Sequence, residues 1–310
     1  MAAVMSPDRR LQGVLEAVPA WAGAARVRTS PLGGGITNQN FLVEVDEQRF
    51  VARLAGRDTD LLGIDREAER AAAEAAHAVG IGPEVVAFLP ELGCLVTRFI
   101  EAEPIGVEAM RQPRTLHRTV GAIRAFHGAP LLPSTFSPHR VVKAYGETAE
   151  ARGVVIPRAH DELLPLSHRI EEAFARRRAA PKPCHNDLLN ANFLLAKDRV
   201  FIVDYEYAGM GDVFFDLGNF SVNHEFDDYA DGALLTAYFG DVTPARTARL
   251  KLMRIMSDFR ESMWGVVQQS ISTLDFDYRG YAEGHFDRAL ALAADRRVER
   301  WLSDAREAAA

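Results

Sequence analysis

Cysteine is scarce in the sequence, and long hydrophobic runs are missing. The 310 residues contain two cysteines, Cys94 and Cys184, too few for a disulfide framework, and neither belongs to a Cys-x-x-Cys pair. No stretch reaches the roughly 18 uninterrupted apolar residues that a membrane-spanning helix needs. Residues 1–10 lack the basic start and apolar core of a secretory signal. These absences predict a protein of the reducing cytoplasm without a membrane span.

An excess of positive charge is also lacking. Acidic residues number 43 against 36 lysines and arginines, which gives a formal net charge of −7. This balance argues against nucleic acid as a partner. It is compatible with a small cationic ligand, although bulk charge alone does not select one.

The order of the expected elements indicates two lobes. A chain of 310 residues exceeds the roughly 250–300 at which a single core stops growing. We therefore predict an α+β fold with a small β-rich lobe over residues 1–100 and a larger, mainly helical lobe over residues 101–310. Residues 26–31 are expected to be a loop, and residues 100–105 a connector between the lobes. The β-rich lobe is expected to run strand, strand, helix, strand, strand, over the second half of residues 32–45 and then residues 50–54, 64–79, 84–88 and 94–99.

Helical patterns dominate the larger lobe. Val120, Ile123 and Phe126 share one helix face, for example. Residues 128–157 hold several prolines and are expected to be irregular. The Ala-rich residues 1–25 predict one further helix in the smaller lobe. The expected elements of the larger lobe are helices over residues 116–127, 161–178 and much of 216–310, and a strand hairpin over residues 192–203.

The segment that begins at Cys184 carries the residues with the clearest chemistry. In Cys-His-Asn-Asp-Leu-Leu-Asn-Ala-Asn, Asp187 and Asn192 stand five residues apart, and Asp204 follows twelve later, after a short strand. Phosphoryl transfer needs one carboxylate to accept the proton of the attacking hydroxyl, and an amide and a second carboxylate to hold Mg²⁺ against the phosphates of ATP. Protein kinases use the same order of residues. The pattern therefore predicts a kinase that uses ATP and Mg²⁺.

Other interpretations of this segment stay open. Asp-x4-Asn also arises by chance in hairpins with an exposed acidic turn. His185 is a candidate catalytic base, because histidine titrates near neutrality. It can instead brace the loop through hydrogen bonds.

A glycine run in the smaller lobe could cover phosphates. Gly34 and Gly35 lie between strand-like segments and lack the Gly-Lys-Ser/Thr of a Walker A loop. The main-chain N–H groups of this loop, with the following Thr37 and Asn38, suit a phosphate-covering hairpin. A plain flexible turn is the alternative.

Arg53 is a second candidate for contact with phosphate. It lies in the expected strand Val-Ala-Arg-Leu, and its forked guanidinium suits phosphate oxygens. In a kinase it would pair with a carboxylate of the next helix, either Glu67 or Glu69. The alternative is a surface arginine on an alternating strand.

Three stretches of the sequence resemble signatures of the choline/ethanolamine kinases. They are His-Asn-Asp-Leu-Leu-Asn-Ala-Asn at residues 185–192, Val-Asp-Tyr-Glu-Tyr-Ala-Gly with Phe-Asp-Leu-Gly-Asn at 203–219, and the aromatic-rich residues 264–287. That family belongs to an aminoglycoside-phosphotransferase-like, protein-kinase-like group. The resemblance covers about residues 30–290, and it implies a bilobal protein-kinase-like fold with ATP between the lobes.

The resemblance also implies roles for individual residues. Asp187 would be the catalytic base, Asn192 and Asp204 would hold Mg²⁺, and Asp216 would brace the catalytic loop. Arg53 and Glu69 would anchor the phosphates. Adenine would meet main-chain groups of Arg98, Phe99 and Ile100.

For the acceptor, the resemblance implies an acidic and aromatic pocket that binds a small cationic alcohol. A quaternary ammonium cannot donate hydrogen bonds, so aromatic faces and nearby carboxylates hold it. Trp264 also shares a helix face with Gln268 and Ile271, so core packing is the alternative for it. The residues at the pocket positions are Asp187, Glu206, Tyr207, Asn223, Glu261, Trp264 and Tyr281.

The pocket differs from the common choline kinase pattern in three places. Glu261 stands where a second tryptophan is common, Asn223 lies near an acidic position, and Leu189 replaces a glutamine. A glutamate in place of tryptophan suits a primary ammonium with N–H donors better than a trimethylated one.

Two other functions stay open at this point. A kinase of the same fold could act on thiamine, an aminoglycoside or a sugar-like alcohol. A catalytically inactive pseudokinase could bind nucleotide or amines as a sensor, although each catalytic position holds a competent side chain. The sequence does not specify the oligomeric state, and a homodimer is compatible with it.

Overall fold

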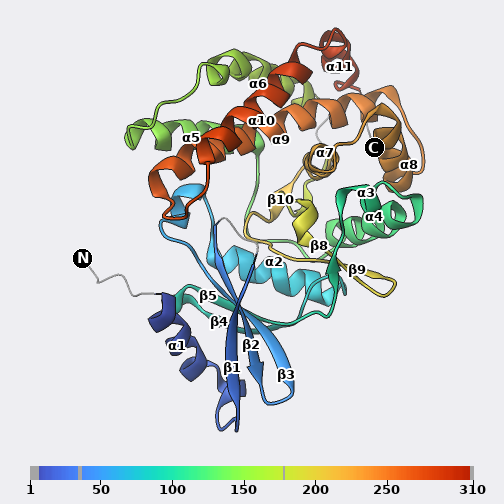
Figure 1. Ribbon diagram of the computed structural model, residues 1–310. Helices are drawn as coiled ribbons and strands as arrows, with labels where there is room; N and C mark the ends of the chain where they lie inside the picture. The colour runs from blue at the N-terminus through green and yellow to red at the C-terminus, as the bar shows by residue number, and fades with distance from the viewer. Residues whose placement is uncertain (1–6, 34–36, 177–178, 308–310) are drawn as a thin grey trace.

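The computed structural model describes residues 7–33, 37–176 and 179–307, which form a β-rich part and a larger helical part (Figure 1). A five-stranded antiparallel sheet lies at one end of the molecule, and long helices lie at the other. The predicted α+β class is confirmed. The strands run in the order β1-β2-β3-β5-β4 and span β1 (Val27–Leu32), β2 (Gln39–Val45), β3 (Gln48–Leu54), β4 (Val85–Leu89) and β5 (Cys94–Arg98).

The two faces of this sheet have different partners. Helix α1 (Pro7–Ala17) and a 3-10 turn (Pro19–Trp21) bury an apolar cluster with one face, to which Phe50 of β3 contributes. Alternate residues of a strand point to opposite faces, so Arg53 of the same strand faces the other way. On that side lies α2 (Arg66–Ala78), between the sheet and the helical part (Figure 1).

Strand β1 corrects the expectation of a loop at residues 26–31. All of its residues but the last are exposed, so it lacks the alternation of apolar and polar residues that marks a half-buried strand. Its pairing comes from main-chain contacts with β2, with Val27 opposite Val45. Pro31 is tolerated because β1 is an edge strand of the sheet.

The helical part is built around α9, a helix of 28 residues. It is buried on nearly all sides, because α5, α7, α10 and α11 pack against it. Gly218 of α7 permits one of these close approaches, since a Cβ there would lie 2.7 Å from the Met253 carbonyl carbon. The helices are α3 (Val107–Met110), α4 (Pro113–His127), α5 (Pro138–Ala151), α6 (Ala159–Ala175), α7 (Val213–Asn223), α8 (Asp228–Phe239), α9 (Pro244–Ile271), α10 (Tyr278–Ala293) and α11 (Val298–Asp304).

Helix α5 corrects the expectation that residues 128–157 are irregular. Pro138 is the first residue of a 14-residue helix, and Ser137 precedes it as the N-cap. Proline interrupts a helix interior but suits the first turn, where its missing N–H has no intrahelical partner. Treating Pro138 as a breaker was therefore wrong.

Two small sheets connect the β-rich part to the helices. The predicted hairpin is confirmed as β8 (Phe193–Ala196) and β9 (Arg199–Ile202), and β6 (Glu103–Pro104) pairs with β8. The second small sheet pairs β7 (Lys182–Cys184) with β10 (Gly209–Gly211). The segments that follow β7 and β9 carry the candidate catalytic residues. The remaining short elements are 3-10 turns at Thr59–Leu62, Pro90–Leu92 and Asn190–Asn192.

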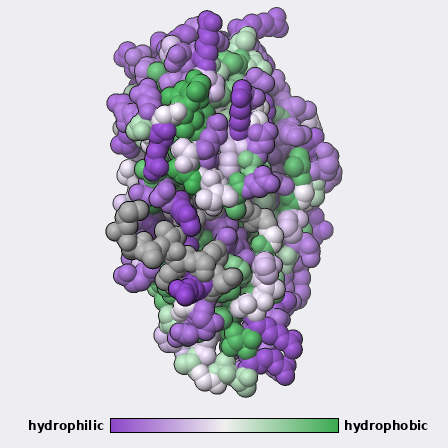
Figure 2. All heavy atoms as spheres, turned by 60° about the vertical axis from the view of Figure 1, so that its left-hand side comes forward, coloured by the Kyte–Doolittle hydropathy of each residue, from purple (hydrophilic) through white to green (hydrophobic). Residues whose placement is uncertain are grey.

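Hydrophilic side chains are common on the face of the molecule that Figure 2 shows. Hydrophobic residues lie on this face in separate small groups. No helix within the described ranges is long and apolar enough to cross a membrane.

Candidate active site

Asp216 organises the loop that follows β7. Its carboxylate accepts hydrogen bonds from the main-chain N–H groups of His185, at 2.8 Å, and Asn186, at 2.6 Å. His127 of α4 contacts the same carboxylate through Nε2 at 2.9 Å. Asp216 is fully buried, so these bonds hold the loop in one position against α7. These contacts agree with the bracing role that the resemblance implied for Asp216.

Further hydrogen bonds hold the rest of the loop that follows β7. Asn219, one turn along α7, accepts a hydrogen bond from the Leu188 N–H at 2.5 Å and donates to Ser257 of α9 at 3.0 Å. Asn186 has a left-handed backbone (φ 64°), a conformation that asparagine tolerates better than most residues. Its side-chain amide donates to the Tyr207 carbonyl at 3.0 Å. The loop is therefore held by hydrogen bonds to the protein's own groups.

His185 serves as a brace within this loop. Its Nε2 donates to the Val203 carbonyl at 3.0 Å, and its Nδ1 accepts from the Asp187 N–H at 3.2 Å. Both ring nitrogens are thus engaged with the main chain, and burial lowers the pKa of the imidazole. The geometry favours the bracing interpretation of His185 over its use as a catalytic base.

Asp187 lies at the centre of a group of charged side chains. Burial raises the pKa of its carboxyl group well above the usual value, the positive charge of Arg260 opposes that rise, and Glu261, Asp204 and Glu206 add to it. The interaction between two charges weakens as the distance between them grows, so the groups that shift this pKa most lie nearby. The carboxylates at and after the end of β9 therefore share one region with Asp187.

The predicted metal ligands come from the two ends of the β8–β9 hairpin. The Asn192 side-chain amide donates to the Asp187 carbonyl at 2.9 Å, and the Asn192 carbonyl accepts from the Val203 N–H at 3.0 Å. Asp204 follows Val203 with a left-handed backbone (φ 70°). An amide oxygen and a carboxylate are oxygen donors, the type that Mg²⁺ prefers, so these side chains fit such an ion.

Arg53 joins the sheet to these carboxylates. Its guanidinium forms ion pairs with Glu69 of α2 and with Asp204, and both Arg53 and Glu69 are largely buried. Glu67, the other candidate, is exposed and pairs with Arg70 instead. The helix register therefore selects Glu69 as the partner of Arg53.

Glu206 contacts the β-rich part of the molecule. Its carboxylate accepts a hydrogen bond from the Asn38 side-chain amide at 2.8 Å and lies 3.3 Å from a guanidinium nitrogen of Arg66. These partners of Glu206 thus belong to the segment before β2 and to α2, and its predicted substrate contact stays a prediction. Asn38, predicted at the phosphates, here joins the segment just before β2 to Glu206.

The glycine-rich segment is described from Thr37 onward. Thr37 is half-buried, and its carbonyl lies so close to Gly56 that a Cβ there would be 2.2 Å from the oxygen. The predicted phosphate-covering residues Gly34 and Gly35 lie outside the described residues.

The segment predicted to meet adenine is partly engaged in the sheet. The Arg98 N–H donates to the Glu84 carbonyl at 2.9 Å, and the Phe99 N–H donates to the Arg49 carbonyl at 3.0 Å. These two donors are therefore committed to the protein. An adenine would have to be recognised by the other main-chain groups of residues 98–100, so this contact stays a prediction.

Tyr207, Trp264, Tyr281 and Glu261 form an aromatic and acidic cluster near Asp187. The indole Nε1 of Trp264 donates to the Tyr207 hydroxyl at 2.9 Å, and the rings of Trp264 and Tyr281 lie 5.4 Å apart. The Tyr281 hydroxyl donates to Glu261 at 2.8 Å. Four of the predicted acceptor residues thus come together.

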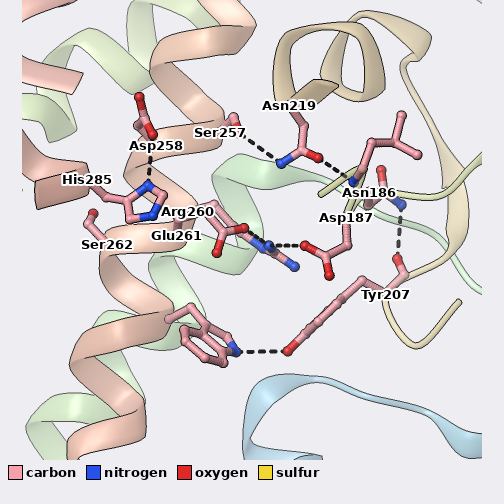
Figure 3. Close-up of polar contacts among 12 residues, drawn as sticks. Asn186, Asp187, Tyr207, Asn219, Ser257, Asp258, Arg260, Glu261, Ser262 and His285 are labelled. Carbon is pink, nitrogen blue, oxygen red and sulfur yellow. Dashed lines mark hydrogen bonds and ion pairs between the residues drawn. The ribbon is translucent and has the colours of Figure 1, made fainter. Parts of the chain in front are cut away.

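Arg260 is the residue of this site that the sequence interpretation missed. Its guanidinium lies between Asp187, at 3.4 Å, and Glu261, with which it forms an ion pair, and it stacks over the Tyr207 ring at 4.3 Å (Figure 3). An arginine in a helix that is buried on nearly all sides requires a buried partner, but the local sequence does not show that this helix is so deeply buried.

Asn223 is not joined to this cluster. It is the last residue of α7, and its side-chain Nδ2 is buried without a hydrogen-bond partner among the described residues. The residues after it turn toward Arg111, which contacts the carbonyl groups of His224 and Glu225. The predicted substrate contact of Asn223 therefore has no support from hydrogen bonds or ion pairs.

Comparisons with known proteins agree with this geometry. Residues 28–250 match the model of the phosphotransferase enzyme family. The chain is 25% identical over 270 residues to protein LicA of Haemophilus influenzae, covering 84% of this chain and 78% of that protein. It is 25% identical over 317 residues to ethanolamine kinase 2 of Mus musculus, covering 90% of this chain and 79% of the mouse protein.

A solved structure is similar over nearly the whole length. A choline/ethanolamine kinase family protein from Mesorhizobium loti superimposes with a TM-score of 0.82 at 30% sequence identity, covering 96% of this chain and 98% of the other. The bilobal, protein-kinase-like fold predicted from the sequence is thereby confirmed. The chain belongs to the phosphotransferase enzyme family and, within it, to the choline/ethanolamine kinase family.

Proposed function

We propose that this protein transfers the γ-phosphoryl group of ATP to the hydroxyl of a small amino alcohol of the choline or ethanolamine type. The observation that carries the proposal is the position of Asp187. On one side it adjoins Asn192 and the Arg53–Asp204 pair, and on the other it adjoins the cluster of Tyr207, Trp264, Tyr281 and Glu261. A base between a phosphate-binding side and an acceptor-binding side is what phosphoryl transfer requires.

On the phosphate side, different side chains would contact the phosphates and the metal ion. Arg53, held by Glu69, would contact phosphate oxygens, and Asn192 and Asp204 would hold Mg²⁺. Such an ion would offset the negative charge of the phosphates. The Asp187 carboxylate would accept the proton of the acceptor hydroxyl, whose oxygen forms the new bond to phosphorus as the bond to ADP breaks.

On the acceptor side, aromatic rings and one carboxylate would hold the amine. Aromatic faces attract cations, and Glu261 adds a negative charge in a buried site. These features favour a positively charged acceptor over the sugar-like alcohols that a related kinase could use.

The test is product analysis after the protein is mixed with Mg²⁺, ATP and either choline or ethanolamine. Mass spectrometry should find ADP and the phosphorylated amino alcohol in equal amounts. Asp187→Asn, analysed in parallel, should form both products at least about 10²-fold more slowly. ATP binding without phosphorylated product from either alcohol would instead favour a pseudokinase, and turnover of thiamine or an aminoglycoside alone would favour the alternative acceptors.

Three further aspects stay predictions. We place the boundary between the lobes near residue 100, where β5 has ended. The cytoplasmic location rests on the sequence alone. A homodimer stays compatible with the chain.

A further inference from the structure

Arg260 is an unusual residue to find beside a cation-binding cluster. Its side chain is 1% exposed, and its Nη1 contacts both Asp187 and Glu261. Its Nε and Nη2 are buried and have no hydrogen-bond partner among the residues that the structure describes. Burying a guanidinium is costly unless carboxylates compensate for it, and two buried carboxylates do so here.

The position of the guanidinium matters as much as its charge. Its Cζ lies 4.3 Å from the centroid of the Tyr207 ring. A cation over an aromatic face and within about 6 Å of the ring centroid makes a favourable cation–π interaction with that face. The protein's own arginine therefore covers the Tyr207 face that a ligand cation would otherwise contact.

The other aromatic surfaces of the cluster are also partly covered by protein. Trp264 packs against Tyr281 at 5.4 Å and against Tyr278 at 5.8 Å. Its Nε1 is used by the Tyr207 hydroxyl. Little aromatic surface is left for a trimethylated ammonium, which depends on such faces because it cannot donate hydrogen bonds.

The charges favour an acceptor of a particular kind. Asp187 and Glu261 supply two negative charges and Arg260 supplies one positive charge, so the group has one negative charge to spare. One acceptor ammonium balances it. Glu261 already accepts from Tyr281, and a carboxylate can accept further hydrogen bonds from ammonium N–H groups.

We propose that Arg260 is a specificity-determining and positioning residue of the acceptor site. It occupies the face of Tyr207 and so excludes quaternary ammonium groups, which leaves Glu261 to select acceptors whose ammonium carries N–H groups. It also holds Oδ1 of Asp187, which leaves Oδ2 for the acceptor hydroxyl (Figure 3). This proposal rests on the proposed function and adds the choice between the two amine types.

The test compares acceptors that differ only in N-methylation. Steady-state kcat and KM are measured with ethanolamine, dimethylethanolamine and choline for the wild type, Arg260→Met and Arg260→Lys. Wild-type kcat/KM should be at least about tenfold higher for ethanolamine than for choline, since the two rely on different contacts. Arg260→Met uncovers the Tyr207 ring, so the KM of choline should fall. The ratio of kcat/KM for choline to that for ethanolamine should rise about tenfold, and kcat should be lower for both amines.

Arg260→Lys separates the two parts of the role. Lysine keeps a positive charge near the two carboxylates but lacks the planar group that stacks on the ring. It should restore part of the lost kcat while the ratio stays shifted toward choline. A purely structural role would lower turnover of all three acceptors equally, and an unchanged ratio in both variants would overturn the proposal. If Arg260→Met does not fold, the kcat/KM ratio of choline to ethanolamine in Arg260→Lys tests the proposal by itself.

A matched control is Arg254→Met, on the same helix. Arg254 pairs with Asp231, which keeps Lys251 as a second partner after the substitution. The ratio of choline to ethanolamine should stay at its wild-type value. A wild type that phosphorylates both amines equally well, or prefers choline, refutes the inference about Arg260 alone, whereas one that phosphorylates neither refutes the proposed function itself.

Discussion

The two sides of Asp187 solve the problem of burying charge in different ways. On the phosphate side, Arg53 connects a strand, a helix and a loop, because it pairs with Glu69 and Asp204. On the acceptor side, Arg260 and Glu261 are neighbours on a single helix, and only Arg260 reaches Asp187. On the phosphate side, ion pairs join segments that are distant in the sequence. On the acceptor side, the charged pair lies within one turn of α9, so substitutions in that turn alone can alter it.

This difference has a chemical reason. The phosphates and the metal of a nucleotide are the same whatever the acceptor, so the groups that meet them have little freedom to vary. Acceptors differ in size, charge and hydrogen-bonding groups, and a helix that presents side chains to them can vary without disturbing the fold. The acceptor side is therefore where this chain departs from the pattern that it resembles.

The largest expected effect comes from the residue that both sides share. Asp187→Asn keeps the shape of the side chain but removes the proton acceptor, and positioned base catalysis contributes about 10²–10⁴-fold. We expect kcat to fall by that range while ATP still binds, as measured by isothermal titration. A fall of well under tenfold would mean that another group accepts the proton and that the two sides do not meet at Asp187.

A pair of variants on α2 tests the phosphate side. Glu69→Gln removes one of the two carboxylates that hold Arg53, so kcat/KM for ATP should fall by about tenfold or more. Glu67→Gln, on the exposed face of the same helix, should change it by less than about twofold. The kinetic constants for the amine should move little in either. Equal effects of the two substitutions would show that the Arg53–Glu69 pair does not position the nucleotide.

Much of the fold could be predicted because local patterns agree with it. Strands β8 and β9 follow from two short strand-like runs with a Lys-Asp turn between them, and α2 follows from its composition and its terminal glycine. Strand β1 could not be found in this way, because an exposed edge strand has no buried face to create a pattern. Helix α5 was missed because a proline at the first position looks, in sequence, like a proline that breaks a helix.

The site also contains residues that could be predicted from local sequence and one that could not. Asp187, Asn192 and Asp204 could be predicted because their spacing along the chain carries the chemistry. Arg260 could not, since nothing local distinguishes an arginine that reaches a buried carboxylate from one that faces solvent. Which face of α9 meets Asp187 depends on the packing of α7 and α10 around it, and this is a property of the whole helical part.

The helical part should also be the more sensitive to acid. Burial lowers the pKa of His139 in α5 and of His224, which follows α7, to about 4. An unfolded histidine has a pKa near 6.5, so between these values the unfolded state binds more protons and stability falls as the pH falls. Each should cost about 1.4 kcal/mol per pH unit below 6.5.

Urea unfolding at pH 7.5 and pH 5.5 measures this effect. His224→Gln should reduce the difference between the two free energies of unfolding by about 1 kcal/mol, because glutamine does not titrate. The variant can be less stable at both pH values without affecting the comparison. A pH difference as large as in the wild type would mean that His224 is not protonated on unfolding in this range.

The smallest expected effect separates two tyrosines of α10. Both rings pack against Trp264, but the hydroxyl of Tyr281 donates to Glu261, whereas that of Tyr278 contacts Ser272. Tyr281→Phe leaves Glu261 with one partner fewer, and a hydrogen bond to a charged group contributes about 1.5–3 kcal/mol, part of which the amine can replace. We expect the KM of the amine to change by about three- to tenfold, with the KM of ATP unchanged.

Tyr278→Phe is the matched control, because it removes a hydroxyl from a ring of the same cluster without touching the carboxylate. It should leave both KM values within about twofold of the wild type. If the two variants alter the amine KM equally, the cluster acts only through ring packing, and the carboxylate of Glu261 has no part in binding the acceptor. If only Tyr281→Phe alters the KM of the amine, binding of the acceptor depends on a single carboxylate of α9. The phosphate side differs, because Arg53 there is held by two carboxylates from separate segments.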